Sequence, residues 1–149
     1  MSIQIERVGH VVLSVRELDR SVAFYAGVLG LREVGRYGPN MVFFSATGSN
    51  HHDLALLELG PKARPPDPGA VGLVHFALKI GNSLDELRAA KRQLEAAGIA
   101  IIRMENHAVA NSIYLADPDG NEIEIYVDGD PQRWREDPAA VASVAPLDL

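Results

Sequence analysis

The stretch HAVANSIYLADPDGNEIE, which runs from His107 to Glu124, organises the interpretation of the whole chain. It predicts a strand, a tight turn on the residues DPDG and a second strand. Proline at the second turn position presets φ, and glycine at the fourth accepts conformations that other residues resist. Such a hairpin would hold His107, Tyr114 and Glu124 on a stiff frame. An imidazole, a phenol and a carboxylate held together can bind a metal ion and move protons.

The composition is that of an ordinary globular protein. The chain has 149 residues, of which 47% are hydrophobic and 23% charged, enough for one domain with a sizeable core. A net charge of −6 argues against nucleic acid or an anionic membrane as the main partner. The absence of cysteine excludes disulfides and thiolate metal sites. Because the sequence contains no apolar run long enough for a membrane span and no secretory signal, we expect a cytoplasmic protein.

The chain repeats one plan, in which a strand is followed by a helix and about three further strands. The first module covers about residues 5–60, and the second covers about residues 70–127. His75 stands at the start of the second module in the place that His10 occupies in the first. The repeat predicts an α+β fold of two βαβββ modules, whose curled mixed sheet encloses a cavity.

Hydrophobic periodicity predicts the individual elements. The expected strands are 9–15, 31–37, 41–46, 52–59, 73–80, 100–104, 111–116 and 122–127. The expected helices are residues 17–29, which Gly30 ends, and residues 84–97, which start at a capping box of Ser83 and Glu86.

Two segments lie outside the regular elements. Residues 60–69 form a Pro-rich linker between the modules, because proline cannot continue either a helix or a sheet ladder. The two modules and this linker make residues 1–127 a single domain. Residues 128–149 form a C-terminal tail, for which Trp134 is the expected anchor.

His10, His75 and Glu124 come from three separate strands and supply two neutral imidazoles and one carboxylate. That set suits non-haem Fe(II) and leaves coordination positions open for substrate and O₂; Mn(II) is chemically compatible with it. A lone histidine on a strand is more often a hydrogen-bonded core residue, but the matching places of His10 and His75 favour metal binding. Glu122 and Glu124 point the same way by strand alternation, so periodicity does not choose between them.

The paired modules resemble the vicinal oxygen chelate superfamily, which includes glyoxalase I, fosfomycin-resistance proteins, bleomycin-binding proteins and type I extradiol ring-cleavage dioxygenases. The resemblance covers about Ile5 to Val127. It rests on the segments GHVVLSV, SVAFYAGVLGL and DPDGNEIEIY. The resemblance implies the superfamily fold, but by itself it says little about the reaction.

A narrower resemblance is to the extradiol dioxygenases. Their late signature is matched here by His107, Ile113-Tyr114, Asp117-Pro118, Gly120 and Glu124. The sequence departs from it at Glu105, where the signature has a small or neutral residue. The segment HDLAL, which begins at His52, is similar to the one that carries an oxygen-site histidine in these enzymes. The signature selects Glu124 over Glu122 as the metal ligand.

The resemblance implies an enzyme of aromatic compound catabolism that opens the ring of a catechol-type diol beside its two hydroxyl groups, using Fe(II) and O₂. His52 would stabilise the bound oxygen and donate a proton. Tyr114 would help to deprotonate the diol, with His107 as its hydrogen-bonded neighbour. His51 is expected to face away from His52 on the same strand. Phe43 or Phe44 could line a cavity for an aromatic substrate.

Two other functions remain open on the sequence. In glyoxalase I the metal takes two histidines and two glutamates, and Glu58 lies where the fourth ligand would fall; a solvated charge at a strand end is the other interpretation of Glu58. The third function is metal-free binding of a small molecule, as in bleomycin-resistance proteins. By analogy with two-module relatives, we expect a homodimer.

Overall fold

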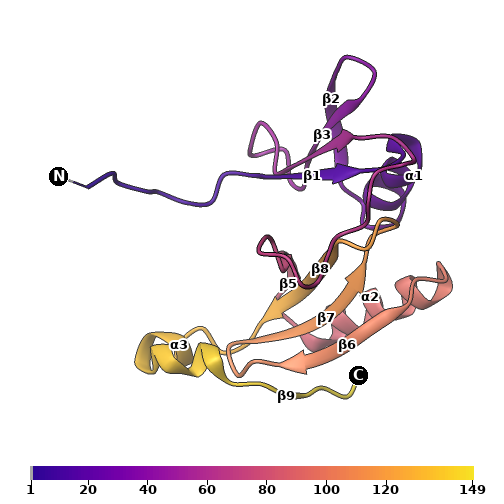
Figure 1. Ribbon diagram of the computed structural model, residues 1–149. Coiled ribbons are helices and arrows are strands. Elements are labelled where there is room, and N and C mark those ends of the chain that lie inside the picture. The colour runs from indigo at the N-terminus through magenta and orange to yellow at the C-terminus, as the bar shows by residue number, and fades with distance from the viewer. Residues whose placement is uncertain (1) are drawn as a thin grey trace. The chain divides into compact units, whose positions relative to one another are not determined.

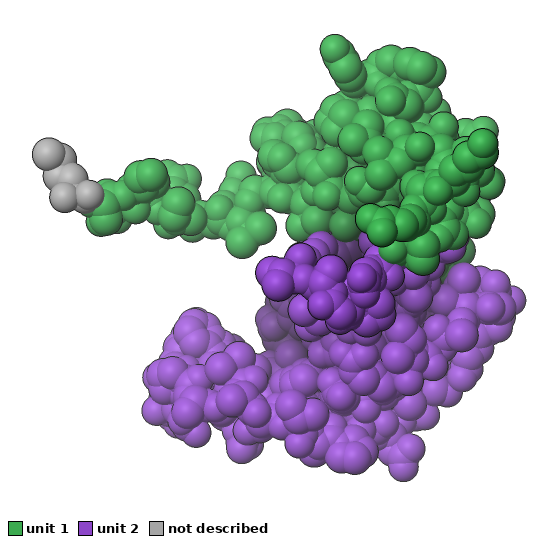
Figure 2. Space-filling model, in the orientation of Figure 1, with its two compact units in different colours: residues 1–65 green, residues 66–149 purple. Residues whose placement is uncertain are grey.

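Each predicted module folds around a sheet of its own. The computed structural model describes residues 2–149, which separate into two compact units, residues 2–65 and residues 66–149 (Figure 2). The boundary falls inside the predicted Pro-rich linker. Each module completes a separate ladder, in place of one continuous sheet, because its first strand pairs in parallel with its own last strand.

Residues 2–65 form a four-stranded sheet with one helical segment (Figure 1). The elements are β1 (Val11–Val15), α1 (Leu18–Val22), the π-helix η1 (Ala23–Val28), β2 (Arg32–Tyr37), β3 (Met41–Ser45) and β4 (Leu54–Glu58). The strand order is β1-β4-β3-β2, and only the β1–β4 pair is parallel in this part of the chain. The large buried side chains include Tyr25, Phe44, Leu54, Leu56, Val15 and Val42.

The helix predicted over residues 17–29 is present, but its second half is wound as a π-helix. The Leu29 N–H donates to the Phe24 carbonyl at 3.0 Å, five residues back along the chain. Gly30 then ends the segment with a φ of 76°, as predicted. At the other end, the Glu58 carboxylate accepts from the Leu18 N–H at 2.6 Å. Glu58 therefore satisfies one of the free N–H groups that open α1.

Residues 66–149 form a five-stranded sheet that one long helix covers (Figure 1). Its elements are β5 (His75–Gly81), α2 (Leu84–Ala96), β6 (Ile101–Asn106), β7 (Ala110–Ala116), β8 (Glu122–Asp128), α3 (Arg133–Glu136), the 3₁₀ helix η2 (Pro138–Ala142) and β9 (Ala145–Pro146). The order is β5-β8-β7-β6-β9. α2 packs against β5, β7 and β8 through Leu87 and Leu94, which are buried. No helix within residues 2–149 has the length and apolar character needed to cross a lipid bilayer.

The predicted hairpin of β7 and β8 is confirmed, together with its turn. The Asp117 carboxylate accepts hydrogen bonds from the N–H groups of Asp119 and Asn121, each at 2.8 Å. Gly120 has a φ of 92°, where a side chain would be strained. The turn sets the register in which Tyr114 lies opposite Glu124.

The C-terminal tail is an ordered part of the second unit. Trp134 is not its buried anchor, because 49% of its surface is exposed. Ala140 is buried instead, and β9 pairs antiparallel with β6 at Glu105 and Asn106. The tail is thus attached mainly through its backbone.

The predicted capping box at the start of α2 is confirmed. The Ser83 hydroxyl accepts from the Glu86 N–H at 3.3 Å, and the Glu86 carboxylate accepts from the Ser83 N–H at 2.9 Å. We expect Ser83→Ala to lower the free energy of unfolding by about 1 kcal/mol, because it leaves an N–H of the first helical turn without its partner. Urea denaturation measures this. Ser83→Thr keeps a hydroxyl acceptor and should retain most of the stability; equal losses in both variants would contradict the assignment.

Candidate active site

Three of the predicted site residues meet on neighbouring strands of the second unit. His75 begins β5, Glu124 lies in β8 and Tyr114 lies opposite Glu124 in β7. The Nε2 of His75 is 3.2 Å from Oε2 of Glu124, and the rings of His75 and Tyr114 are nearly perpendicular, with centroids 5.5 Å apart. Strand pairing therefore brings an imidazole, a carboxylate and a phenol together from three segments of the chain.

The His75–Glu124 pair has the donor atoms that a metal ion requires. Two ligand atoms about 2.1 Å from one ion, at a right angle, stand roughly 3 Å apart, close to the distance observed. The other Glu124 oxygen accepts from the buried Ser112 hydroxyl at 2.5 Å. Ser112 thereby orients the carboxylate and leaves Oε2 directed at His75. The pair thus fits two positions of a divalent-metal site.

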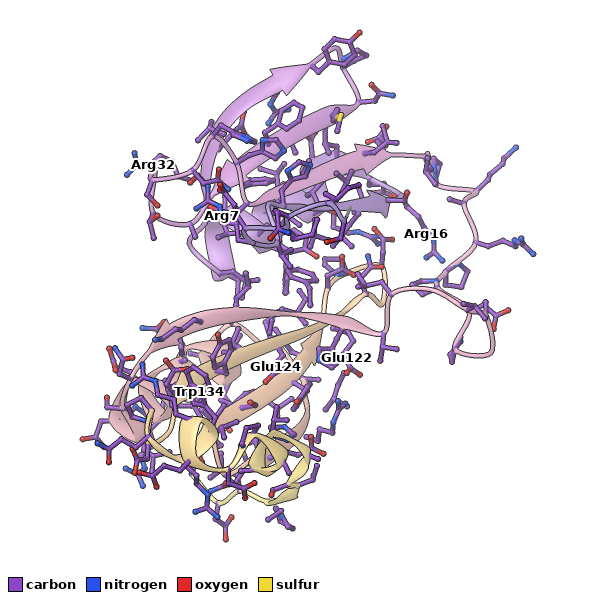
Figure 3. All side chains as sticks on the ribbon, turned by 90° about the vertical axis from the view of Figure 1, so that its left-hand side faces the viewer. Arg7, Arg16, Arg32, Glu122, Glu124 and Trp134 are labelled. Atoms are coloured by element: carbon purple, nitrogen blue, oxygen red, sulfur yellow. The ribbon has the colours of Figure 1, made fainter. Side chains whose placement is uncertain are left out.

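The neighbouring Glu122 has a different environment. Both of its oxygens accept from the Arg103 guanidinium, at 3.0 and 2.8 Å, and this bidentate pairing lowers the pKa of Glu122. Figure 3 shows Glu122 and Glu124 along the same strand. Because its partner is a guanidinium, Glu122 is less available to a metal than Glu124. The structure thus supplies a distinction between the two carboxylates that strand alternation left open.

Glu122 also lies beside the second nitrogen of His75. Within residues 2–149, the buried Nδ1 of His75 has no hydrogen-bond partner, and Oε1 of Glu122 lies 3.7 Å from it. Metal-binding histidines usually direct their other nitrogen at a carboxylate or carbonyl. With Nε2 toward Glu124 and Nδ1 toward Glu122, His75 has the orientation of such a ligand.

Tyr114 is almost fully buried between charged groups. Burial, together with the nearby carboxylates of Glu124 and Glu105, raises its pKa to about 12. The Arg103 guanidinium lies over the phenol ring, 3.7 Å from its centroid, and opposes this shift. Tyr114 is therefore protonated at neutral pH and able to donate a hydrogen bond.

His107 adjoins Tyr114, as predicted. Its Nε2 is 2.8 Å from the Tyr114 hydroxyl oxygen, and its Nδ1 is 3.2 Å from the carbonyl oxygen of Ser143 in the tail. Glu105, at the position that departs from the extradiol signature, places Oε2 3.5 Å from His107 Nε2. The imidazole is therefore contacted from β6, β7 and the tail.

The first unit contains a cluster of three histidines. β4 begins at Leu54, so His51 and His52 lie in the preceding loop and do not follow strand alternation. The prediction that they face apart is wrong: their Nδ1 atoms are 2.6 Å apart. The ring centroids of His10 and His52 are 4.1 Å apart. Partial burial, with His10 and His51 nearby, lowers the pKa of His52.

Asn50 and Asp53 hold this loop against the start of β1. The Asn50 amide donates to the carbonyl of Gly9 at 3.1 Å and to the Asp53 carboxylate at 3.1 Å. The Asp53 carboxylate also accepts from the Ala46 N–H at 2.7 Å, and that bond is the largest cause of its lowered pKa. These contacts explain why His52 is followed by an aspartate: the carboxylate fixes the loop that presents the imidazole.

Phe43 and Phe44 have different surroundings. Phe43 meets the His52 ring edge-on, with centroids 5.2 Å apart, whereas Phe44 is fully buried in the core. Of the two aromatic residues, Phe43 is therefore the one beside a predicted catalytic residue.

The predicted metal ligands are divided between the units, with His10 in the first and His75 and Glu124 in the second. Within residues 2–149, no three side chains of histidine, aspartate or glutamate are gathered so that they could hold a metal ion. The assignment of all three to one ion stays a prediction.

The order of elements and this arrangement of residues match a known family. Residues 7–125 match the profile of the Glyoxalase/Bleomycin resistance protein/Dioxygenase superfamily. The chain belongs to this superfamily. A solved glyoxalase/dioxygenase from Nostoc punctiforme superposes with a TM-score of 0.72 at 24% identity, over 87% of this chain and 99% of that one. The similarity of structure shows the superfamily fold.

Curated relatives carry the names of ring-cleaving enzymes. The chain is 35% identical to catechol-2,3-dioxygenase of Bacillus subtilis, over 87% of this chain and 44% of the relative. It is 32% identical to biphenyl-2,3-diol 1,2-dioxygenase 2 of Rhodococcus globerulus, over 80% of this chain and 61% of the relative. The chain thus spans about half the length of these relatives.

Two further relatives are named for their metal. One is an iron-dependent extradiol dioxygenase of Rhodococcus jostii, 32% identical over 81% of this chain and 43% of the relative. The other is a manganese-dependent 2,3-dihydroxybiphenyl 1,2-dioxygenase of Geobacillus genomosp. 3, 28% identical over 86% of this chain and 38% of the relative.

Sequence reasoning missed the supporting residues of the site. Ser112 shares a strand face with Tyr114, two residues away, so alternation could have indicated it. Arg103 and the Ser143 carbonyl carry no comparable signal, because they reach the site only through the pairing of β6 with β7 and β9.

The Arg103–Glu122 pair should contribute to stability in a pH-dependent way. We expect Arg103→Met to lower the free energy of unfolding by about 1 kcal/mol at pH 7, a modest amount because Arg103 is partly exposed. Arg103 lowers the pKa of Glu122 in the folded state. The loss in free energy of unfolding caused by Arg103→Met therefore has its full size above the ordinary glutamate pKa of about 4.3. This stability difference disappears as the pH falls through the pKa that Glu122 has in the folded protein.

Urea denaturation at several pH values tests this expectation. Arg88→Met is the matched control, because the Arg88–Asp85 pair lies on the solvent-exposed side of α2 and should contribute nothing measurable. A difference for Arg103→Met that persists unchanged at low pH would show that the guanidinium stabilises the fold by packing alone.

Proposed function

We propose that this chain catalyses extradiol cleavage of a catechol-type aromatic diol with Fe(II) and O₂. The observation that carries the proposal is the cluster of His75, Glu124, Tyr114 and His107, in which a metal-type pair of ligands adjoins a hydrogen-bonded phenol and imidazole. The names of the curated relatives support the same reaction class.

His10, His75 and Glu124 would hold the metal, with Mn(II) as the alternative to iron. Fe(II) bound in this way would supply open coordination positions for a diol and for O₂, and would let electrons pass from the diol to O₂. The protein's part is to orient the ligands. Ser112 holds one oxygen of Glu124, and Glu122 lies beside the far nitrogen of His75.

Tyr114 and His107 would handle the protons that the diol loses. At neutral pH the phenol is protonated, so its oxygen can accept a hydrogen bond from a diol hydroxyl while its own hydrogen is directed at Nε2 of His107. As a diol proton passes to the Tyr114 oxygen, the phenol proton can pass to Nε2 of His107, 2.8 Å away. This exchange needs no phenolate at any stage, which suits a tyrosine with a raised pKa.

His52 would act on the oxygen side, holding one oxygen atom of O₂ and supplying the proton that its cleavage requires. Asn50 and Asp53 fix the loop that carries it. Phe43 beside His52 offers an aromatic edge to a planar ring.

The glyoxalase-like alternative is disfavoured by Glu58. That alternative needs Glu58 as a fourth ligand, but Oε2 of Glu58 accepts from the N–H of Leu18 at the start of α1, and no imidazole lies beside the carboxylate within residues 2–149. The carboxylate thus has a structural role at the start of α1.

Anaerobic loading with Fe(II) tests the ligand assignment. We expect Glu124→Gln to abolish iron binding, because an amide is a poor ligand for the ion. Glu122→Gln should keep the iron with an affinity lower by no more than about 10- to 100-fold, the usual effect of altering a neighbour of a ligand. Metal analysis after gel filtration measures both, and His75→Ala should lose the iron. Loss in Glu122→Gln and retention in Glu124→Gln would reverse the assignment.

Addition of catechol and O₂ to the loaded protein then tests the reaction. A yellow ring-fission product is the expected result. Turnover of a methylglyoxal–thiol adduct in its place would identify a glyoxalase-like isomerase. Ligand binding that needs no metal would identify a small-molecule binding protein.

A further inference from the structure

We propose that the last part of the C-terminal tail, residues 138–149, positions the proton-transfer pair by fixing the tautomer of His107. The contact responsible is between Nδ1 of His107 and the carbonyl oxygen of Ser143, at 3.2 Å. The catalytic consequence rests on the proposed function, but the tautomer itself does not. Ser143 and His107 are 36 residues apart, so the tail is brought to the imidazole by the fold.

The Ser143 contact determines which nitrogen carries the proton. A carbonyl oxygen only accepts hydrogen bonds, so Nδ1 of His107 must be the donor. In the neutral imidazole the other nitrogen, Nε2, then has a free lone pair. That atom is 2.8 Å from the Tyr114 hydroxyl oxygen, so the imidazole can accept from the phenol, in competition with the Glu124 carboxylate, to which the phenol is also hydrogen-bonded. The tail thereby makes His107 a proton acceptor for Tyr114.

Glu105 would favour the opposite tautomer. Its Oε2 lies 3.5 Å from Nε2 of His107, and a carboxylate attracts an N–H. With a proton on Nε2, His107 would no longer accept from Tyr114. The Ser143 carbonyl and the Glu105 carboxylate thus compete for the position of one proton. Removing the tail leaves Glu105 without a competitor.

The tail is held in place without the help of His107. β9 pairs with the end of β6, the strand that leads into His107, and Figure 1 shows the two running together. The Leu147 N–H donates to the Met104 carbonyl at 3.2 Å. Before Ser143, η2 is capped by the Asp137 side chain and buries Ala140. The carbonyl is therefore presented by a structure attached on both sides of it.

The backbone of His107 is constrained as well. Ala108 has a φ of 64°, and the Val109 N–H donates to the His107 carbonyl at 2.7 Å, which makes a strained γ-turn. The Gly129 N–H donates to the Val109 carbonyl at 2.7 Å. A Cβ on Gly129 would lie 3.1 Å from that carbonyl group. Close packing of Gly129 thus holds the turn, so the backbone that carries the imidazole is fixed independently of Ser143.

The test is the tautomer of His107, measured by NMR on protein with ¹⁵N-labelled imidazole rings and assigned with His107→Asn. In the full chain we expect neutral His107 with its proton on Nδ1. In a chain that ends at Asp137 we expect the proton on Nε2. Ser143→Ala keeps the backbone carbonyl and should match the native protein. An unchanged tautomer in the shortened chain, or an Nε2 proton or a fully protonated ring in the full chain at neutral pH, would overturn the proposal.

A second variant removes the Ser143 contact without shortening the chain, so the test does not depend on whether the shortened chain folds. Replacing residues 143–149 by a Gly-Ser segment of equal length keeps η2 and Ala140 but removes the β9 pairing, and it should also move the proton to Nε2. Circular dichroism confirms that each variant is folded. A folded replacement variant that keeps the native tautomer counts against the proposal.

Activity separates this proposal from the proposed function. In the iron-loaded protein we expect the replacement variant to retain its metal and to lose roughly tenfold or more in kcat, within the usual range for general acid–base groups. A changed tautomer in a chain that never cleaves catechol refutes the dioxygenase assignment alone. Unchanged cleavage by a variant with a changed tautomer refutes the catalytic role of the tail alone.

Discussion

Tyr114 lies directly opposite Glu124 across the β7–β8 ladder, and the second-unit part of the site depends on this register. Side chains alternate between the two faces of a sheet, so a slip of one residue would turn the phenol or the carboxylate to the other side. The turn at Asp117 excludes such a slip, because its carboxylate is hydrogen-bonded to two N–H groups within the turn. His75 joins the pair because β5 runs parallel to β8.

One arginine organises the carboxylates of the second unit. Arg103 binds Glu122 at both oxygens, forms an ion pair with Glu105 and covers the ring of Tyr114. Glu124 is left with two neutral hydroxyl partners, Ser112 and Tyr114, and with His75. Of two glutamates on one strand face, one is therefore compensated by a guanidinium and the other is directed at an imidazole. Opposite environments of this kind commonly separate a structural carboxylate from a functional one.

Much of the fold follows from local patterns in the sequence. The two modules, the capped helix α2, the DPDG turn and most strand bounds depend on periodicity and turn chemistry within a few residues. Errors arose where a neighbour distant in sequence intervenes. β4 starts later than predicted, so His51 and His52 contact each other in a loop that Asn50 ties to Gly9. The tail is attached by backbone pairing to β6, which Trp134 does not reveal.

The sequence by itself determined the superfamily fold and the residue types of the site, since a histidine at the start of each module and the HAVANSIYLADPDGNEIE stretch are read from order and spacing. Only the tertiary structure decided that Glu122 is paired with Arg103 while Glu124 faces His75, and that Ser143 contacts His107. The physical reason is that these contacts join side chains and carbonyls from separate strands. Their partners are chosen by strand register and by the path of the tail, which no local pattern encodes.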